Sequence, residues 1–364
     1  MSWLLVFLGF SLLIILHEAG HFFAAKATGM RVEKFFLFFG PKLVSIKRGE
    51  TEYGIATIPI GGFVKISGMN SEEELPPEIE PRAYYRQSAW KRIVVIAAGP
   101  TVNVALAFAI LFFIYFADAQ QVTQSVGEIR SGTPASKVLR VGDKILAVDG
   151  KSYARLGSVE RHEKLSEAIA AHGCRQKEDG CLAPSPAPVR LTISRQGAVR
   201  TISIRPEYRK EYGTSLIGVT YKTVPENIGV GTAASRALDT ISLVARKTGS
   251  VFARIFESKQ RKEISGVVGI SDAAHQTIDV GVYPSLFLLA LVSLSLGLVN
   301  LLPILPLDGG HIFWTLVEKL RGSPVSLRTM ERASAVGIVL VVMLFVIGLT
   351  NDIGRLTGEG FHVR

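Results

Sequence analysis

The chain has 364 residues, of which 48% are hydrophobic, and its formal net charge is +10 at pH 7. This length is enough for two or three structural units, and the mean hydropathy of +0.31 is high for a soluble protein. The chain has two cysteines, Cys174 and Cys181, which excludes a metal site built from cysteines. A basic chain can bind nucleic acid, but here the positive charge lies beside apolar segments, as is typical of membrane proteins. We therefore expect the lipid bilayer as a partner and no nucleic acid.

Four segments are long and apolar enough to cross a bilayer, which takes about 20 residues. They are residues 2–27, 93–116, 284–302 and 333–349. The first segment has no basic start and no convincing small-residue cleavage site. We therefore expect a retained helix there and not a removed signal peptide.

The first apolar segment contains His17-Glu18-Ala19-Gly20-His21. Residues four apart share one face of a helix, so His17 and His21 can both bind a single metal ion. Glu18 follows the first of these ligands and is placed to act as a general base. This H-E-x-x-H pattern is typical of zinc peptidases, and polar residues in a membrane helix favour a functional site.

Loop charge predicts the orientation of the spans. Lysine and arginine are frequent between the first and second spans and again between the third and fourth, so both loops are expected to be cytoplasmic. Residues 118–283 and both termini are then extracytoplasmic. Residues 118–283 are basic as well, but long domains cross membranes largely regardless of charge.

Residues 50–66 alternate in polarity and are rich in β-branched and aromatic residues, with a break at Pro59 and Gly61-Gly62. The pattern predicts a β-hairpin or a sheet edge. Its apolar character suggests that it enters the bilayer, where non-helical backbone is tolerated beside a wet cavity; a small cytoplasmic hairpin is the alternative. In the second span, Asn103 follows Gly99-Pro100 and is expected either to serve helix packing or to line the active cavity.

Residues 122–222 read as a β-rich domain, with strands expected at 125–129, 144–148, 189–194, 200–204 and 216–220. The stretch VGDKILAVDG at 141–150 resembles the core strand and turn of a PDZ domain, and residues 157–172 resemble its helix. PDZ domains bind extended peptides along a sheet edge. Residues 173–188 read as an inserted loop, in which Cys174 and Cys181 are predicted to form a disulfide on the oxidising side.

Two further segments follow this domain. Residues 231–256 predict a basic amphipathic helix, which either lies on the membrane surface or packs on the PDZ-like domain. Residues 263–271 are expected to be a short, flexible, apolar connector to the third span.

The third span ends in NLLPILPLDGGH, residues 300–311. The prolines prevent a continuous helix and predict an extended loop that returns to a helix near Gly309. Two histidines leave a catalytic zinc site one protein ligand short, and Asp308 is the natural third ligand. His311 competes for that role, and a plain helix N-cap is the alternative for Asp308.

With these motifs the chain resembles the bacterial site-2 proteases of the regulator-of-sigma branch, which are intramembrane zinc metalloproteases. The resemblance covers most of the chain, in the order of that family, and rests on HEAGHFFAAKATGMRVEKFFLFFGPKL, ETEYGIATIPIGGFVK, AAGPTVN, VGDKILAVDG, ISGVVGIS and NLLPILPLDGG. It departs from the family in having one PDZ-like domain where some members have two, and in carrying Leu305-Pro306 where many members have the proline one place earlier. The cysteine loop is not explained by the resemblance.

The resemblance implies a set of site residues. Zn²⁺ would be bound by His17, His21 and Asp308, with Glu18 as the catalytic acid and base. Asn300 and Pro303 would help to hold the substrate strand, and the hairpin 53–65, which contains Gly61 and Gly62, would present an edge to it. The implied substrates are single-pass membrane proteins, such as anti-sigma factors or remnant signal peptides, in regulated intramembrane proteolysis.

The expected fold is a polytopic α-helical protein of the bacterial inner membrane, with four transmembrane helices, a membrane-associated β-hairpin and an inserted extracytoplasmic PDZ-like domain. Its expected parts are 1–121 (two helices, HEAGH and the hairpin), 122–222 (the PDZ-like domain), 223–283 (amphipathic helix and connector) and 284–364 (two helices and NLLPILPLDGG). Two other classes stay open: an inactive scaffold whose PDZ-like domain captures partners, and a zinc peptidase that acts on soluble peptides at the membrane face.

Overall fold

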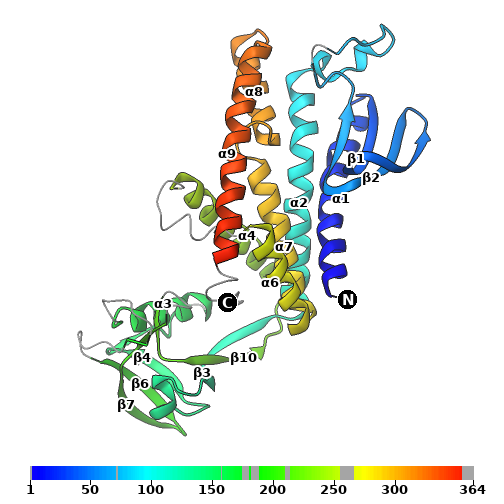
Figure 1. Ribbon diagram of the computed structural model, residues 1–364. Coiled ribbons are helices and arrows are strands. Elements are labelled where there is room, and N and C mark those ends of the chain that lie inside the picture. Colours follow the sequence, from blue (N-terminus) through cyan, green and yellow to red (C-terminus); the bar gives the residue numbers. More distant parts are fainter. Residues whose placement is uncertain are drawn as a thin grey trace. The chain divides into compact units, whose positions relative to one another are not determined.

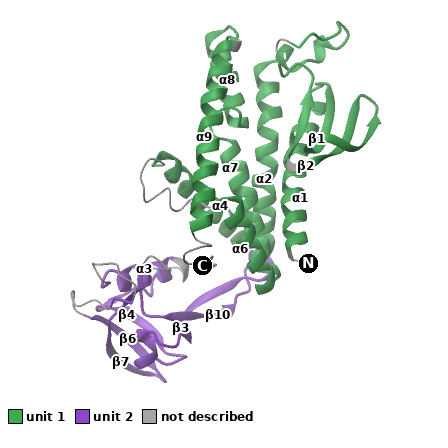
Figure 2. Cartoon of the chain, viewed as in Figure 1, with its two compact units in different colours: residues 1–114, 230–364 green, residues 115–229 purple. Residues whose placement is uncertain are grey.

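The computed structural model describes residues 2–70, 73–156, 158–173, 180–181, 188–209, 214–254 and 266–354. The chain divides into two compact units (Figure 2). Unit 1 comprises residues 1–114 and 230–364, and unit 2 comprises residues 115–229. Unit 2 is thus inserted in the sequence of unit 1.

Unit 1 contains four helices that are long and apolar enough to span a membrane: α1 (Ser2–Ala27), α2 (Ala89–Ala117), α7 (Val282–Asn300) and α9 (Leu327–Gly354). They are the long helices of Figure 1. Each corresponds to one predicted span, but α7 ends at Asn300 and not at residue 302. Helix α9 begins at Leu327 and not at residue 333, because polar residues continue the helix beyond its apolar part. Pro100 lies inside α2 without ending it.

Two long strands, β1 (Val32–Arg48) and β2 (Thr51–Ile66), form the sheet of unit 1. The expected break at Pro59 does not end β2; instead its two halves flank β1. Residues 34–37 of β1 pair on one side with residues 62–65 and on the other with residues 52–55, while residues 42–48 pair with residues 51–56. Residues 62–65 therefore form one outer row of this sheet, and β2 contacts α1.

Shorter elements complete unit 1. The 3₁₀ helices η1 (Glu80–Arg82) and η2 (Tyr84–Arg86) precede α2. Helix α4 (Val230–Ala253) contacts α7, and α8 (Asp308–Arg321) precedes α9. The predicted flexible connector at 263–271 is wrong for its described part, because helix α6 (Val267–Val280) begins there; residues 263–265 lie outside the described residues.

Unit 2 is built on a six-stranded sheet of order β10-β3-β4-β6-β7, with β5 paired to β4. Its strands are β3 (Gln120–Ile129), β4 (Lys144–Val148), β5 (Lys151–Ser152), β6 (Val189–Arg195), β7 (Ala198–Ile204) and β10 (Val219–Pro225). The strands β8 (Glu207–Arg209) and β9 (Thr214–Leu216) form a separate pair, and η3 (Pro134–Lys137) and α3 (Ser158–Ala170) are its helices.

One predicted strand of unit 2 needs correction. Residues 216–220 do not form a single strand, because β9 ends at Leu216 and β10 starts at Val219. Between them Gly218 adopts φ = +83°, a left-handed conformation that interrupts a strand and that glycine tolerates. The carbonyls of Ile217 and Gly218 accept hydrogen bonds from Ala135 and Arg130 instead.

The core of unit 2 follows from alternation along its strands. Val189, Leu191 and Ile193 of β6 are fully buried while their neighbours point away. Leu165 and Ile169, four apart on α3, belong to the same core. Cys181 is disulfide-bonded, and its predicted partner Cys174 lies outside the described residues, so this pairing stays a prediction.

Candidate active site

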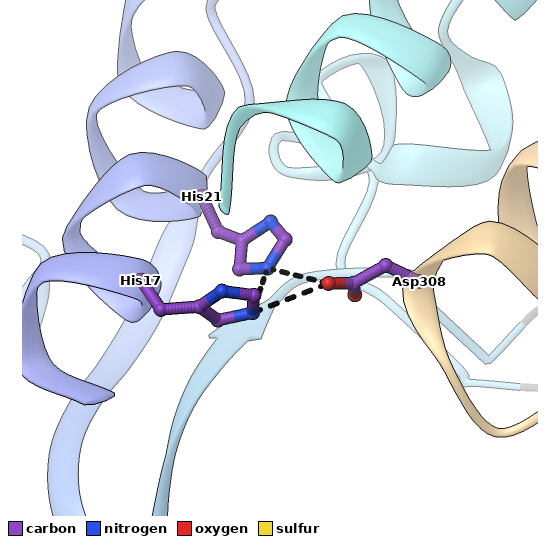
Figure 3. A group of neighbouring side chains, drawn as sticks. All are labelled: His17, His21 and Asp308. Carbon is purple, nitrogen blue, oxygen red and sulfur yellow. Dashed lines mark hydrogen bonds and ion pairs between the residues drawn. The ribbon is translucent and has the colours of Figure 1, made fainter. Parts of the chain in front are cut away.

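Three side chains from two distant parts of unit 1 converge inside the helices (Figure 3). His17 and His21 lie one turn apart on α1 and are each 7% exposed, and Asp308 is the first residue of α8. The Nε2 atoms of His17 and His21 are 3.2 Å and 3.4 Å from Oδ2 of Asp308 and 3.3 Å from each other. The helical spacing of HEAGH thus brings both imidazoles to one carboxylate oxygen.

This triangle fits a zinc ion. Tetrahedral zinc with bonds of about 2.0–2.1 Å has its ligand atoms about 3.3 Å apart, which matches the three distances above. The donor set of two neutral imidazoles and one carboxylate is a set that zinc takes in catalytic sites, with a fourth position left open. Among the described residues these three form the cluster that could hold a metal ion.

Helix α2 holds His21 in place. Nδ1 of His21 lies 2.9 Å from the carbonyl oxygen of Val95, so it donates there and leaves Nε2 free for a metal. Two glycines make this approach feasible, since a Cβ on Gly20 would lie 2.6 Å from the carbonyl oxygen of Ala98 and a Cβ on Gly99 would overlap the His21 ring. The close contact of α1 and α2 at this level therefore depends on small residues.

The loop before α8 sets the position of Asp308. Leu307 is the N-cap residue and no side chain caps the helix, so the alternative reading of Asp308 as an N-cap is wrong. A Cβ on Gly309 would overlap the carbonyl of Leu301, and one on Gly310 would crowd the backbone at Leu305. The two glycines after Asp308 let the loop backbone pack directly on the first turn of α8.

A cavity of about 310 Å³ opens beside the cluster and is lined by both polar and apolar side chains. Glu18 lines it beside His17, and the backbone of Val64 lies close to its carboxylate. A Cβ added to Gly62 would lie 3.1 Å from Cγ of Glu18. The outer row of the sheet therefore faces the cavity next to this carboxylate.

The other predicted site residues divide between the cavity and its surroundings. Gly61, Gly62 and Asn300 line the cavity, whereas Pro303 is exposed and is not among its lining residues. His311 is also outside the lining. Residues that sequence reasoning missed are Met69, Ile96 and Pro306 in the lining and Val95 behind His21.

Asn103 lies away from the cavity, in the contact of α2 with α7. It is fully buried, Ser293 donates to its carbonyl at 2.9 Å, and a Cβ on Gly297 would lie 3.3 Å from its Cβ. Of the two roles considered for Asn103, the structure favours helix packing.

Comparison with known proteins agrees with this site. Residues 5–344 match peptidase family M50. The chain is 31% identical to the zinc metalloprotease Rip1 of Mycolicibacterium smegmatis, with 89% of this chain and 87% of that protein covered. It is 28% identical to the regulator of sigma-E protease RseP of Salmonella typhimurium, over 94% and 96% of the two chains. The match over most of the chain places it in peptidase family M50, the site-2 protease family of zinc metalloproteases, and the HEAGH helix, the Asp308 carboxylate beside it and the apolar helices agree with this.

Proposed function

We propose that the protein is an intramembrane protease that cleaves transmembrane segments of other membrane proteins. The observation that carries this proposal is the position of His17 and His21 within the second half of α1, a helix that is long and apolar enough to span a membrane. Asp308 reaches them from the end of the loop that follows another such helix, α7. A metal site on these helices suits a peptide bond that lies within the bilayer.

A substrate helix must first lose its internal hydrogen bonds. In lipid the freed N–H and C=O groups need new partners, and an exposed strand can supply them by pairing with the substrate backbone. Residues 62–64 are suited to this role, because they are paired with β1 on one side and line the cavity. Asn300, across the cavity, carries an amide that can bind the substrate backbone.

Glu18 is the proton carrier in this proposal. Its carboxylate would take a proton from the attacking water and deliver it to the amine that leaves. The Val64 backbone and the Gly62 Cα lie close to this side chain, so it stands beside the strand that would hold the substrate. Zinc held by His17, His21 and Asp308 would supply Lewis-acid polarisation of the scissile carbonyl.

The sheet of unit 1 has features of a membrane-associated hairpin. In its other outer row Leu43, Val44 and Ile46 are 68%, 61% and 70% exposed. Such a row of exposed apolar side chains is unusual for a surface in water and suits contact with lipid.

We propose that unit 2 is a PDZ-like domain on the extracytoplasmic side. The long apolar helices of unit 1 would lie in the bacterial cytoplasmic membrane. Helix α3 and the edge strand β10 border a groove of about 660 Å³, which suits an extended peptide. The unit would exclude substrates with large outer domains, so that cleavage follows an earlier trimming cut. Anti-sigma factors are substrates of suitable type, as the name of the Salmonella relative, regulator of sigma-E protease, suggests. Remnant signal peptides are a second suitable type.

The test uses the full-length protein in lipid vesicles with a synthetic transmembrane peptide. We expect two products whose masses place the cut within the apolar segment, and we expect the cut to disappear on zinc chelation and return with zinc. Zinc binding without any cut would favour the scaffold, and cleavage of soluble peptides alone would favour a peptidase at the membrane face. Reporter fusions at Glu73 and Gly180 should report opposite sides of the membrane.

A further inference from the structure

A second hollow lies along α1 and α7, separate from the cavity at the histidines. It has a volume of about 410 Å³ and is bordered by α1, α6 and α7. None of the described residues that line it is charged. Its polar lining residue Ser285 already donates its hydroxyl hydrogen within the protein, toward the carbonyls of Gly281 and Thr277 at 2.8 Å and 3.1 Å. The groove is therefore suited to an apolar occupant.

The groove continues toward the active cavity along one stripe of each helix. On α1 the groove residues Val6 and Phe10 are followed, at helical spacing, by the cavity residues Ile14 and His17. On α7 the groove residues Leu289 and Val292 are followed in the same way by Leu296 and Asn300 of the cavity. The two hollows thus lie on the same seam, and about one helical turn separates their linings on each helix.

Helix α6 forms the third wall of the groove with Ala274 and Ile278. Its first turn is fixed by Asp352 of α9, a fully buried carboxylate that accepts the backbone N–H groups of Gly266 and Gly269 at 3.1 Å and 2.8 Å. In the middle of α6, the ring of His275 lies 4.6 Å from that of Trp3 at the start of α1. This wall is therefore held in place at several points and gives the groove a defined shape.

We propose that this groove is a substrate subsite, which rests on the intramembrane cleavage proposed above. It takes apolar side chains from the part of the substrate that remains helical, on the side of the scissile bond that faces the N-terminal end of α1. Continuity with the active cavity argues for the substrate as the occupant, because an apolar segment seated at the histidines must extend along this seam. Eight residues of α1, from Gly9 to His17, correspond to about 12 Å. The contacted side chains should then lie about four to eight residues from the scissile bond.

The first experiment narrows the groove from α6 in the full-length protein. Ala274→Leu should lower kcat/KM about 10-fold for a peptide with Leu or Phe at the contacted position, the usual scale for a tight apolar pocket. The loss should appear as a higher KM. For a peptide with Ala at that position, kcat/KM should change less than about twofold. Zinc content should not change. The matched control is Ala105→Leu, at an exposed alanine of α2.

If Ala274→Leu changes kcat/KM by the same factor for both peptides relative to wild type, the subsite is overturned. If that variant does not fold, a second measurement decides: a substrate peptide with a photoreactive side chain about eight residues from the cut is irradiated with Glu18→Gln protein. Label on Gly9, Ile278 or Leu289 supports the subsite, and label only on exposed positions such as Leu12 contradicts it. Labelling of the groove by a photoreactive lipid that the peptide does not displace would also contradict it. A wild-type protein that cuts no transmembrane peptide refutes the proposed function, while photolabelling still reports on the groove.

Discussion

Two buried carboxylates, Asp143 in unit 2 and Asp308 in unit 1, differ in how they are paired. In unit 2 the Asp143 carboxylate, 2% exposed, accepts one hydrogen bond from the backbone of Arg140 and two from the Arg195 side chain. In unit 1, Oδ2 of Asp308 is buried without a hydrogen-bond partner in the described part of the chain, and it lies 3.2 Å and 3.4 Å from Nε2 of His17 and of His21. Buried polar groups are normally satisfied, so unpaired groups that converge on one point indicate a site that binds something, whereas complete pairing indicates a structural role.

The two units also differ in the size of the side chains at their packing contacts. The core of unit 2 consists of large branched side chains such as Ile145, Leu191 and Ile193. In unit 1, helices meet at small residues, as Gly20 and Gly99 do beside the histidines, which is how membrane helices pack closely. Substitutions should therefore affect chemistry in unit 1 and stability in unit 2.

Of the substitutions that test this difference between the units, Glu18→Gln should have the largest effect, and the effect should be on cleavage. The change keeps the size of the side chain and removes the proton acceptor, so cleavage should fall by about 10²- to 10⁴-fold. Zinc should stay bound at near-normal stoichiometry, because His17, His21 and Asp308 are all retained. Product yield in lipid vesicles and metal analysis of the purified protein measure the two quantities.

Asp308→Asn should instead weaken zinc binding. It removes the anionic ligand from a set of two histidines and one carboxylate, so zinc affinity should fall by about 10²-fold and activity with it. Competition with a chelator gives the affinity. If Glu18→Gln loses its zinc while Asp308→Asn keeps it, the two carboxylates have exchanged roles, and if neither affects cleavage the HEAGH helix is not the active site.

Gly99→Ala should give a smaller effect through the position of His21. The added methyl would overlap the imidazole and push it from the Val95 carbonyl, and loss of such a supporting contact lowers zinc affinity about 10-fold. Gly249→Ala is the matched control, because a Cβ there meets no atom within 4 Å. Unchanged affinity in Gly99→Ala would mean that His21 is not held as described.

Much of unit 1 could be predicted because its signals are local. The four apolar segments and the spacing of His17 and His21 are readable in single stretches of sequence, and Asp308 followed from the count of ligands that a catalytic zinc needs. The contribution of Val95, Met69 and Ile96 to the site could not be read in this way, since it depends on how α2 and β2 pack against α1.

The remaining differences between the predicted and the observed elements concern the strand pairing of β2 and the start of helix α6. The sequence of β2 shows a proline and glycines, which normally end a strand, but pairing of both halves with β1 overrides this local preference. The first part of helix α6 lies within residues 263–271, for which the sequence predicts a flexible connector, yet its N-terminus is capped by Asp352 from the far end of α9. A contact between residues so distant in the chain leaves no local signal.

The smallest expected effect tests the paired carboxylate of unit 2. The guanidinium of Arg195 and the backbone N–H of Arg140 hold the pKa of Asp143 below its usual value. A carboxyl group whose pKa is lower in the folded state than in the unfolded state stabilises the fold at pH values above its unfolded-state pKa of about 3.9. This stabilisation is lost as the pH falls through the folded-state pKa. Asp143→Asn should therefore destabilise unit 2 by about 2 kcal/mol at pH 7, and the difference from wild type should shrink below about pH 4.

Hydrogen exchange of the β4 and β6 amides in the full-length protein measures this loss, because those strands pair beside Asp143. Glu128→Gln is the control, an exposed acid on β3 whose removal should change protection little. Zinc content and cleavage of a short transmembrane peptide should stay at wild-type levels in Asp143→Asn, since the ligands all belong to unit 1. A constant difference in protection between pH 7 and pH 3 would show that the pair stabilises unit 2 by packing and not by its charge.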